Sequence, residues 1–134
     1  MSTTEPDKEM TYLNYVTERV IGCAIEVHRA LGPGLLEHTY EEAMCLEMDR
    51  RRLHFARQSM FPVKYKGVEI GLQRIDLIVE NAVVVELKSV ERFDPVFMAQ
   101  VLTYLRCTGL RLGLLINFNV IRLKDGIVRK VNGL

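Results

Sequence analysis

Two short apolar runs separated by three residues constrain this chain more than any other feature of its sequence. The first run is residues 75–79 (IDLIV) and the second is residues 83–88 (VVVELK). Both are rich in β-branched residues, and their closeness predicts two antiparallel strands of one β-hairpin. Each run also carries ionisable side chains, Asp76 in the first and Glu86 and Lys88 in the second. Because charged groups on core strands are costly unless they are paired or bind a metal, these residues indicate a structural ion network or a functional site.

The length of the connecting loop decides whether the acidic side chains face each other. Glu86 and Lys88 are two positions apart and therefore share one face of their strand. A three-residue loop at 80–82 would place Asp76 opposite Glu86, and Arg74 opposite Lys88. A two-residue loop would put the two carboxylates on opposite faces of the sheet. A functional interpretation therefore requires an odd-length connection or a bulge.

The remaining sequence predicts three helices and further strands around this hairpin. Apolar spacing favours helices over residues 10–31, 35–53 and 95–106, and the third begins with Asp94 as its N-cap and Pro95 at the first helical position. Strands are predicted at residues 60–65, 68–76 and 112–118, with a closing hairpin formed by residues 120–123 and 127–131. This order predicts an α/β or α+β fold in which helices flank a mixed sheet.

Composition is that of a globular protein with one core. The chain has 134 residues, of which 49% are hydrophobic and 26% charged, and a formal net charge of +1. We expect residues 1–9 to form a disordered N-terminal tail and residues 10–134 a single domain. No apolar run is long enough to span a bilayer, and the polar N-terminus lacks the apolar core of a signal peptide, so a cytoplasmic protein without membrane association is expected. Cys23, Cys45 and Cys107 show no zinc spacing and are expected to be buried free thiols.

Two predicted helices carry polar residues on their buried stripes. Glu37 precedes Tyr40 by almost one turn in the second helix, and Gln100 precedes Tyr104 by one turn in the third. Taken alone, Glu37 is explained by the preference for acidic residues near a helix N-terminus.

The hairpin side chains admit two interpretations of equal weight. Two facing carboxylates form an oxygen-rich site suited to Mg²⁺ or Mn²⁺, and a nearby ammonium could orient a water or neutralise charge on a phosphate. The alternative is an ion network of Glu86, Lys88 and Arg74 at a sheet edge. Phosphate loops, paired histidines and nucleophile motifs for acyl transfer are absent from the sequence.

Four sequence elements together resemble one enzyme group. Asp76 followed by Glu86-Leu87-Lys88 resembles the D…(D/E)-x-K signature of the PD-(D/E)XK nuclease superfamily. Residues 34–40 (GLLEHTY) resemble the Gly-x-x-Glu-x-x-Tyr motif that names the GxxExxY family of small proteins in that superfamily. Residues 100–104 (QVLTY) resemble the Gln-x-x-x-Tyr motif of its recombination-exonuclease branch. Residues 31–43 and 110–126 also look like the GxxExxY family. The one departure is Ile75, which stands where the superfamily often has proline.

The resemblance implies a restriction-endonuclease-like fold and a role for each matching residue. Asp76 and Glu86 would bind the metal, the Leu87 carbonyl would complete the site, and Glu37 would bind directly or through water. Lys88 would position or activate the attacking water. The last two roles belong to the third helix, in which Gln100 would orient Lys88 or the phosphate, with support from Tyr104.

Three hypotheses follow for function. The leading one is a Mg²⁺- or Mn²⁺-dependent nuclease acting on nucleic acid, with DNA as the favoured substrate. The second is a non-catalytic nucleic-acid- or protein-binding module on the same fold; because so short a chain leaves little room for further recognition elements, a homodimer or a partner protein could supply them. The third is a scaffold in which Asp76, Glu86, Lys88 and Arg74 form a structural network, so that removing one acid would destabilise the fold. A metal site predicts the reverse for the metal-free protein.

Overall fold

The computed structural model describes residues 5–133 and contains three α-helices, five strands and one 3₁₀-helix within them. Apolar stripes on the helices and continuous apolar runs in the inner strands account for these elements. In chain order they are α1 (Glu5–Leu31), α2 (Glu37–Arg50), β1 (Phe55–Tyr65), β2 (Val68–Val79), β3 (Val83–Lys88), α3 (Pro95–Thr108), β4 (Leu112–Asn117), η1 (Leu123–Gly126) and β5 (Ile127–Val131).

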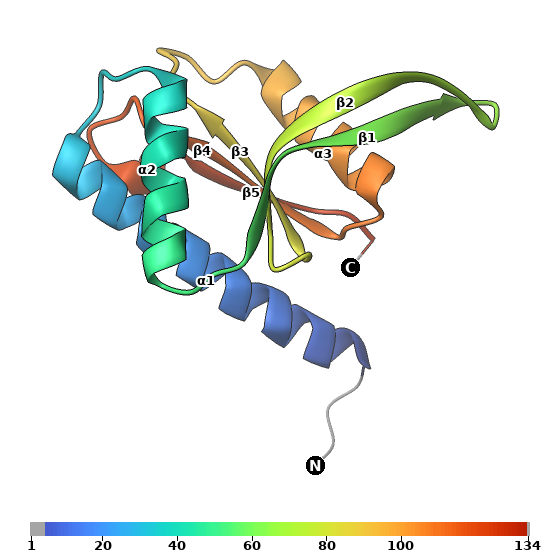
Figure 1. Cartoon of the computed structure of the whole chain (residues 1–134), viewed down its shortest axis with the longest axis horizontal. Coiled ribbons are helices and arrows are strands. Elements are labelled where there is room, and N and C mark those ends of the chain that lie inside the picture. The colour runs from blue at the N-terminus through green and yellow to red at the C-terminus, as the bar shows by residue number, and fades with distance from the viewer. Residues whose placement is uncertain (1–4, 134) are drawn as a thin grey trace.

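The strands form one mixed sheet in the order β1-β2-β3-β4-β5. Neighbouring strands are antiparallel except β3 and β4, which are parallel and are connected by α3. Helices α1 and α2 cover one side of the sheet and α3 covers the other (Figure 1). The predicted mixed sheet flanked by helices is therefore confirmed.

Each side of the sheet has its own hydrophobic core. The larger core joins α1 and α2 to the inner strands, and fully buried Tyr40, Met44 and Met48 of α2 lie within it. The smaller core joins α3 to the strands through Tyr104 and Leu105. Every residue of β4 is buried, as the sequence predicts for a strand covered on both faces.

The loop between β2 and β3 has the predicted length. Val79 pairs with Val83, and the antiparallel ladder continues to Leu77 and Val85, where it ends. Glu80 and Asn81 adopt positive φ values of 53° and 50°, which form the tight turn closed by the bond from the Ala82 amide to the Val79 carbonyl. The register that would bring Asp76 to Glu86 is therefore the one that the chain adopts.

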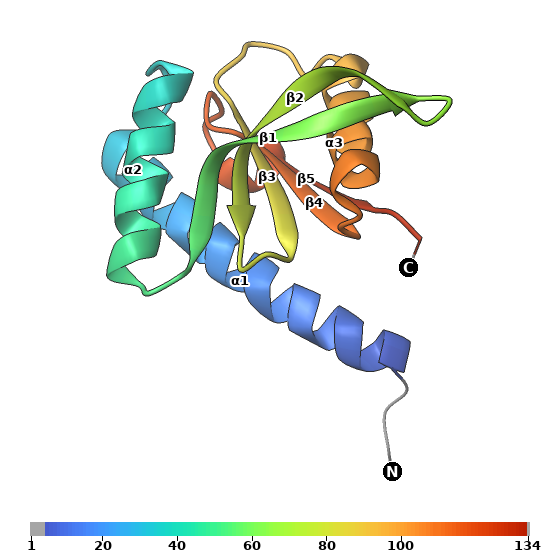
Figure 2. The ribbon, with the colours of Figure 1, turned by 45° about the vertical axis from the view of Figure 1, so that its right-hand side comes forward.

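On the N-terminal side of Asp76, β2 does not pair with β3. There β2 and β1 alone form a two-stranded arm, defined here as residues 60–73. Figure 2 shows this arm curving away from the sheet and over α3. Phe61 of the arm packs onto the smaller core, whereas the opposite face of the arm is exposed at Met60, Ile70 and Leu72. The arm and α3 therefore form two walls next to the Asp76–Glu86 pair.

The predicted boundaries of α1, β1 and α2 differ from those of the structure. Helix α1 begins at Glu5, so residues 5–9 of the predicted tail are helical, and residues 1–4 lie outside the described residues. Strand β1 begins at Phe55 rather than at residue 60, and α2 is shorter at both ends than the predicted 35–53.

The predicted closing hairpin is wrong. Residues 120–122 form no strand, residues 123–126 form η1, and β5 pairs with β4 instead.

Cys23 and Cys45 are buried as expected, but Cys107 is only half-buried. None of the described helices combines the length and the apolar character that crossing a membrane requires.

Candidate active site

The site is centred on two hydrogen bonds between β2 and β3 at the end of their ladder. The Asp76 amide donates to Oε1 of Glu86 at 2.9 Å, and the Leu87 amide donates to Oδ2 of Asp76 at 3.0 Å. Each carboxylate thus accepts a backbone amide hydrogen of the opposite strand. The two strands separate here, and both acidic side chains are held by the backbone in the gap between them.

The two carboxyl groups share a desolvated space. Glu86 is buried, and burial followed by repulsion from Asp76 raises its pKa to about 8. Burial also raises the pKa of Asp76, although the hydrogen bond from Leu87 opposes that shift. A bound cation would favour the ionised form of both acids, which burial disfavours, and would relieve the repulsion that Asp76 exerts on Glu86.

Glu37 lies close enough to contribute to this electrostatic cluster. It begins α2, and it is exposed on the molecular surface. Partial desolvation raises its pKa, the nearby Lys88 ammonium lowers it, and Asp76 raises it. Glu37 and Asp76 line one hollow of about 640 Å³, which we call the Glu37 hollow. Glu37 therefore lies beside Asp76 and adds to the repulsion that raises the pKa of Glu86.

Lys88 continues on the face of β3 that carries Glu86, and it points toward α3. Its Nζ lies 4.7 Å from the centre of the Phe97 ring, a favourable cation–π arrangement. A second hollow of about 350 Å³, which we call the Lys88 hollow, is lined by Lys88, Gln100 and Tyr104. The pKa of Tyr104 is raised by burial and then by repulsion from Glu86 and Asp76, so its ring lies within the field of the two carboxylates.

Helix α3 presents Gln100 and Tyr104 to the strands because its start is fixed. The Asp94 side chain accepts the Val96 amide hydrogen at 2.9 Å, and Pro95 occupies the first helical position, as predicted. Within the described residues, the side chains of Gln100 and Lys88 make no hydrogen bond and no ion pair. Both polar groups are therefore available to a substrate or a water.

A structural ion network of the predicted kind does not form in the described chain. Lys88 makes no ion pair within 4 Å with Asp76 or Glu86. Arg74 is exposed and lines the Glu37 hollow rather than the Lys88 hollow. The hairpin charges are therefore not satisfied by one another.

A second acidic residue of α2, Glu41, was not identified from the sequence. It is buried next to Glu37 in the same hollow, and its carboxylate accepts hydrogen bonds from Arg57 at 2.9 Å and from Gln58 at 2.5 Å. Arg57 also binds Glu42. Glu41 is four positions after Glu37, a spacing that could have indicated it, but its partners come from β1 and only the fold reveals them.

Gln58 marks an irregularity on the other side of Asp76. It adopts a positive φ of 54°, which is unusual for a residue with a side chain, and it has no partner in the β1–β2 ladder, which pairs Arg57 with Leu77 and Ser59 with Ile75. Asp76 is thus the point at which β2 lacks regular pairing on both sides. Backbone strain of this kind often accompanies functional sites.

The donor set fits a divalent cation of the Mg²⁺ type. Among the described residues, no three histidine, cysteine or acidic side chains form a ready-made metal cage. Mg²⁺, however, is commonly held by one or two carboxylates together with waters and substrate phosphates. Asp76 and Glu86 each keep one oxygen outside the two hydrogen bonds described above. Leu87 enters the site through its amide, and a role for its carbonyl stays a prediction.

Comparison with known proteins agrees with this arrangement. A scan against models of protein families matches residues 14–130 to the PD-(D/E)XK nuclease superfamily. Searches of curated proteins and of solved structures returned no match. The five-stranded mixed sheet with helices on both faces is the restriction-endonuclease-like fold that the sequence predicts. Because the family match covers most of the chain, the protein belongs to the PD-(D/E)XK nuclease superfamily.

Proposed function

We propose that this protein is a metal-dependent nuclease that hydrolyses phosphodiester bonds of nucleic acid, with DNA as the favoured substrate. The observation that carries the proposal is the Asp76–Glu86 pair, which the backbone holds between two separating strands beside the unpaired Lys88. Superfamily membership supports nuclease-type chemistry in general.

Asp76 and Glu86 would hold Mg²⁺ or Mn²⁺, and Glu37 would bind it directly or through water. When bound, the cation would supply Lewis-acid stabilisation of the charge that develops on the phosphate. The Leu87 carbonyl is the remaining ligand that we propose. The raised pKa values of the three acids support the assignment, because a cation at this point would favour the ionised forms that burial disfavours.

Lys88 would orient the attacking water and bind a non-bridging phosphate oxygen. Water forms the new P–O bond in line with the ester bond that breaks, and the leaving oxygen departs as an alcohol. Gln100 would orient Lys88 or the phosphate from α3, with Tyr104 in support, since all three residues line one hollow. These roles use side-chain donors that make no hydrogen bond within the described residues.

We further propose that the protein belongs to the GxxExxY family of this superfamily. The motif residues have distinct structural roles, which supports the proposal. Gly34 adopts a positive φ of 100° in the loop before α2, Glu37 begins that helix, and the Tyr40 hydroxyl bonds back to the loop.

The test compares Mg²⁺-dependent nicking or resection of DNA by the wild type and by Asp76→Asn and Lys88→Met. Each variant should lose at least about a hundredfold in rate, since each removes a group that acts on the transition state. Glu69→Gln, an exposed change on the arm, is the matched control and should retain wild-type activity. Equal activity in all four proteins would refute the catalytic assignment.

A second candidate is a nucleic-acid- or protein-binding module without turnover. The absence of a ready-made metal cage among the described side chains favours it. Calorimetry separates the two proposals. Duplex or single-strand binding without measurable Mg²⁺ affinity supports the module, whereas Mg²⁺ binding that Asp76→Asn abolishes supports the nuclease.

A further inference from the structure

A groove runs from the site along α3, beneath the arm. It consists of the Lys88 hollow of about 350 Å³ and an adjoining hollow of about 490 Å³, and Thr103 lines both. Positions 96, 99, 100, 103, 106 and 107 line it at the spacing of one helix face. The opposite wall comes from the arm, through Gln73 near the site and Pro62, Val63 and Lys64 farther out. We call this channel the α3 groove.

The α3 groove and the Glu37 hollow differ in charge. The acidic residues Glu37, Glu41, Glu42 and Asp76 line the Glu37 hollow and outnumber its two arginines, Arg57 and Arg74, of which Arg57 is paired with Glu41 and Glu42. None of the described residues that line the α3 groove is acidic, whereas Lys88, Lys64 and Arg106 contribute three cationic groups. The two sides of the Asp76–Glu86 pair are therefore suited to different ligands: cations on one side and anions on the other.

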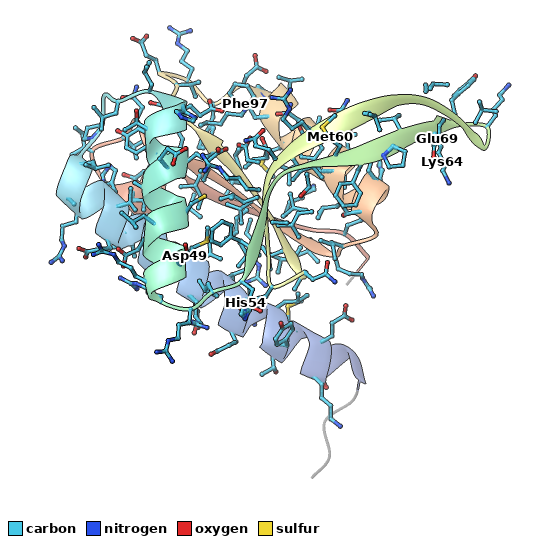
Figure 3. The ribbon with its side chains drawn as sticks, in the orientation of Figure 1. Asp49, His54, Met60, Lys64, Glu69 and Phe97 are labelled. Atoms are coloured by element: carbon cyan, nitrogen blue, oxygen red, sulfur yellow. The ribbon has the colours of Figure 1, made fainter. Side chains whose placement is uncertain are left out.

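The cationic groups at the far end of the groove are available for binding. Lys64 and Arg106 are exposed, and neither makes an ion pair within 4 Å in the described structure. Glu69 is the strand partner of Lys64, but its carboxylate does not pair with that ammonium. In Figure 3, Phe97 marks the site end of α3, and Lys64 and Glu69 lie near the tip of the arm.

The dimensions of the groove suit one nucleic-acid strand. From Phe97 to Arg106 the helix advances about 14 Å at about 1.5 Å per residue. One strand of a stacked nucleic acid carries a phosphate about every 3.4 Å, so this length corresponds to about four phosphates. The arm and α3 line the groove from two sides, so that a nucleic-acid strand lying in it would contact both.

We propose that the α3 groove binds one unpaired strand of the substrate, with Lys64 and Arg106 contacting phosphates next to the one that Lys88 holds. This inference rests on the proposed nuclease function and extends it to the form of substrate, a single-stranded segment. The strand would run from the Asp76–Glu86 pair along α3 toward the tip of the arm.

The first test measures binding of a fluorescent single-stranded oligonucleotide without Mg²⁺, so that no turnover is involved. Lys64→Gln combined with Arg106→Gln should weaken binding at least about tenfold and reduce the magnitude of the slope of log K against log salt by about 1.4, at about 0.7 per lost phosphate contact on single strands. Lys66→Gln combined with Arg122→Gln removes the same charge from exposed positions outside the groove and should leave both quantities near wild type.

The second test uses the native thiols of the wild type. Cys107 lines the α3 groove and is half-buried, whereas Cys23 and Cys45 are buried. A bound single strand should slow maleimide labelling of Cys107 severalfold, and a blunt duplex of equal length should protect it less. Equal binding and equal salt slope in both double variants, or Cys107 labelling that the single strand leaves unchanged, would overturn the groove. Failure of the nuclease proposal is a separate result, in which the wild type binds the strand but does not cleave it with Mg²⁺.

Discussion

Tyr40 fixes the segment that carries Glu37. Its hydroxyl accepts the Leu35 amide hydrogen at 3.2 Å and donates to the Gly32 carbonyl at 2.5 Å. Its ring stacks on Phe118 with a centroid separation of 4.5 Å and an interplanar angle of 7°. Because α2 has no side-chain N-cap, this hydroxyl helps the backbone bonds from Thr39 and Tyr40 to Leu36 to tie the preceding loop to the helix. The position of Glu37 therefore depends on a core residue that is not itself part of the acidic site.

We predict that Tyr40→Phe lowers the free energy of unfolding by about 1–3 kcal/mol, because the Gly32 carbonyl and the Leu35 amide lose a partner in a part-buried site. Urea denaturation followed by circular dichroism measures the change. Tyr12→Phe, at an exposed position on α1, is the control and should change stability by less than about 0.5 kcal/mol. Equal stability of the two variants would contradict this role for the hydroxyl.

The sequence predicts some single-residue features of the site and misses others for physical reasons. Alternation along strands and a three-residue loop are local properties, so the approach of Asp76 to Glu86 follows from them. Glu41 looks like a solvated helix position, because its partner Arg57 lies 16 residues away on β1. Contacts between distant elements have no local signal.

At the scale of elements, the end of β4 holds the end of β3 in place. The Asn117 side chain accepts the Val90 amide hydrogen at 3.0 Å and donates to the Val90 carbonyl at 2.9 Å, while the Phe118 amide donates to the Lys88 carbonyl at 2.9 Å. On the other side of Asn117, η1 approaches so closely that only glycine fits at position 126. These contacts fix the backbone of the segment that presents Lys88.

We predict that Gly126→Ala destabilises the fold by about 2 kcal/mol or more, because the added Cβ would lie 2.1 Å from the Asn117 carbonyl oxygen. Thermal unfolding measures the effect. Gly71→Ala is the control, since its Cβ would meet nothing within 4 Å and its φ is not positive. A Gly126→Ala protein as stable as the control would show that η1 can move away from β4.

The same close approach explains the error in the C-terminal prediction. Residues 120–123 and 127–131 alternate as strands should, with turn residues between them. The chain instead uses residues 123–126 as a 3₁₀ turn packed on β4, and β5 then pairs with β4. Turn residues predict where a chain reverses its direction, but they do not predict with which strand the following strand will pair.

At the scale of the whole molecule, raised acid pKa values couple stability to pH. The pKa of Glu86 is raised to about 8 in the fold, so between about pH 4.5 and pH 8 the folded protein retains a proton that the unfolded chain releases. Stability of the metal-free protein should therefore fall as pH rises through this window. The raised pKa values of Asp76 and Glu37 act in the same direction.

We predict that the metal-free protein loses more than about 1 kcal/mol of stability between about pH 5 and pH 7.5, a range that stays below the ordinary cysteine pKa of about 8.5. Glu86→Gln should flatten this profile and should be more stable than wild type at the upper end. Mg²⁺ should stabilise the wild type most at high pH and the variant least. Urea denaturation at each pH is the measurement, with Glu69→Gln as the control. A flat wild-type profile would contradict the electrostatic description of the site.

Global architecture follows from the sequence more readily than its boundaries do. The order of the predicted helices and strands predicts a mixed sheet flanked by helices, and the sheet has that form, with β3 and β4 as its parallel pair. The start of α1 was missed because residues 5–9 carry no apolar stripe. Their helical conformation continues that of the residues that follow.

The point next to Asp76 at which β2 and β3 separate has a consequence for chain entropy. Asp76 and Glu86 meet across a separation of 10 residues, whereas Glu37 reaches Asp76 from 39 positions earlier in the chain. Loop-closure cost grows by about 0.6 kcal/mol with each doubling of length, so bringing Glu37 to the pair costs about 1.2 kcal/mol more than closing the pair itself. The Tyr40 hydroxyl and the stacked Phe118 ring oppose this cost. The acidic cluster is thus a local pair to which one distant residue is recruited by packing.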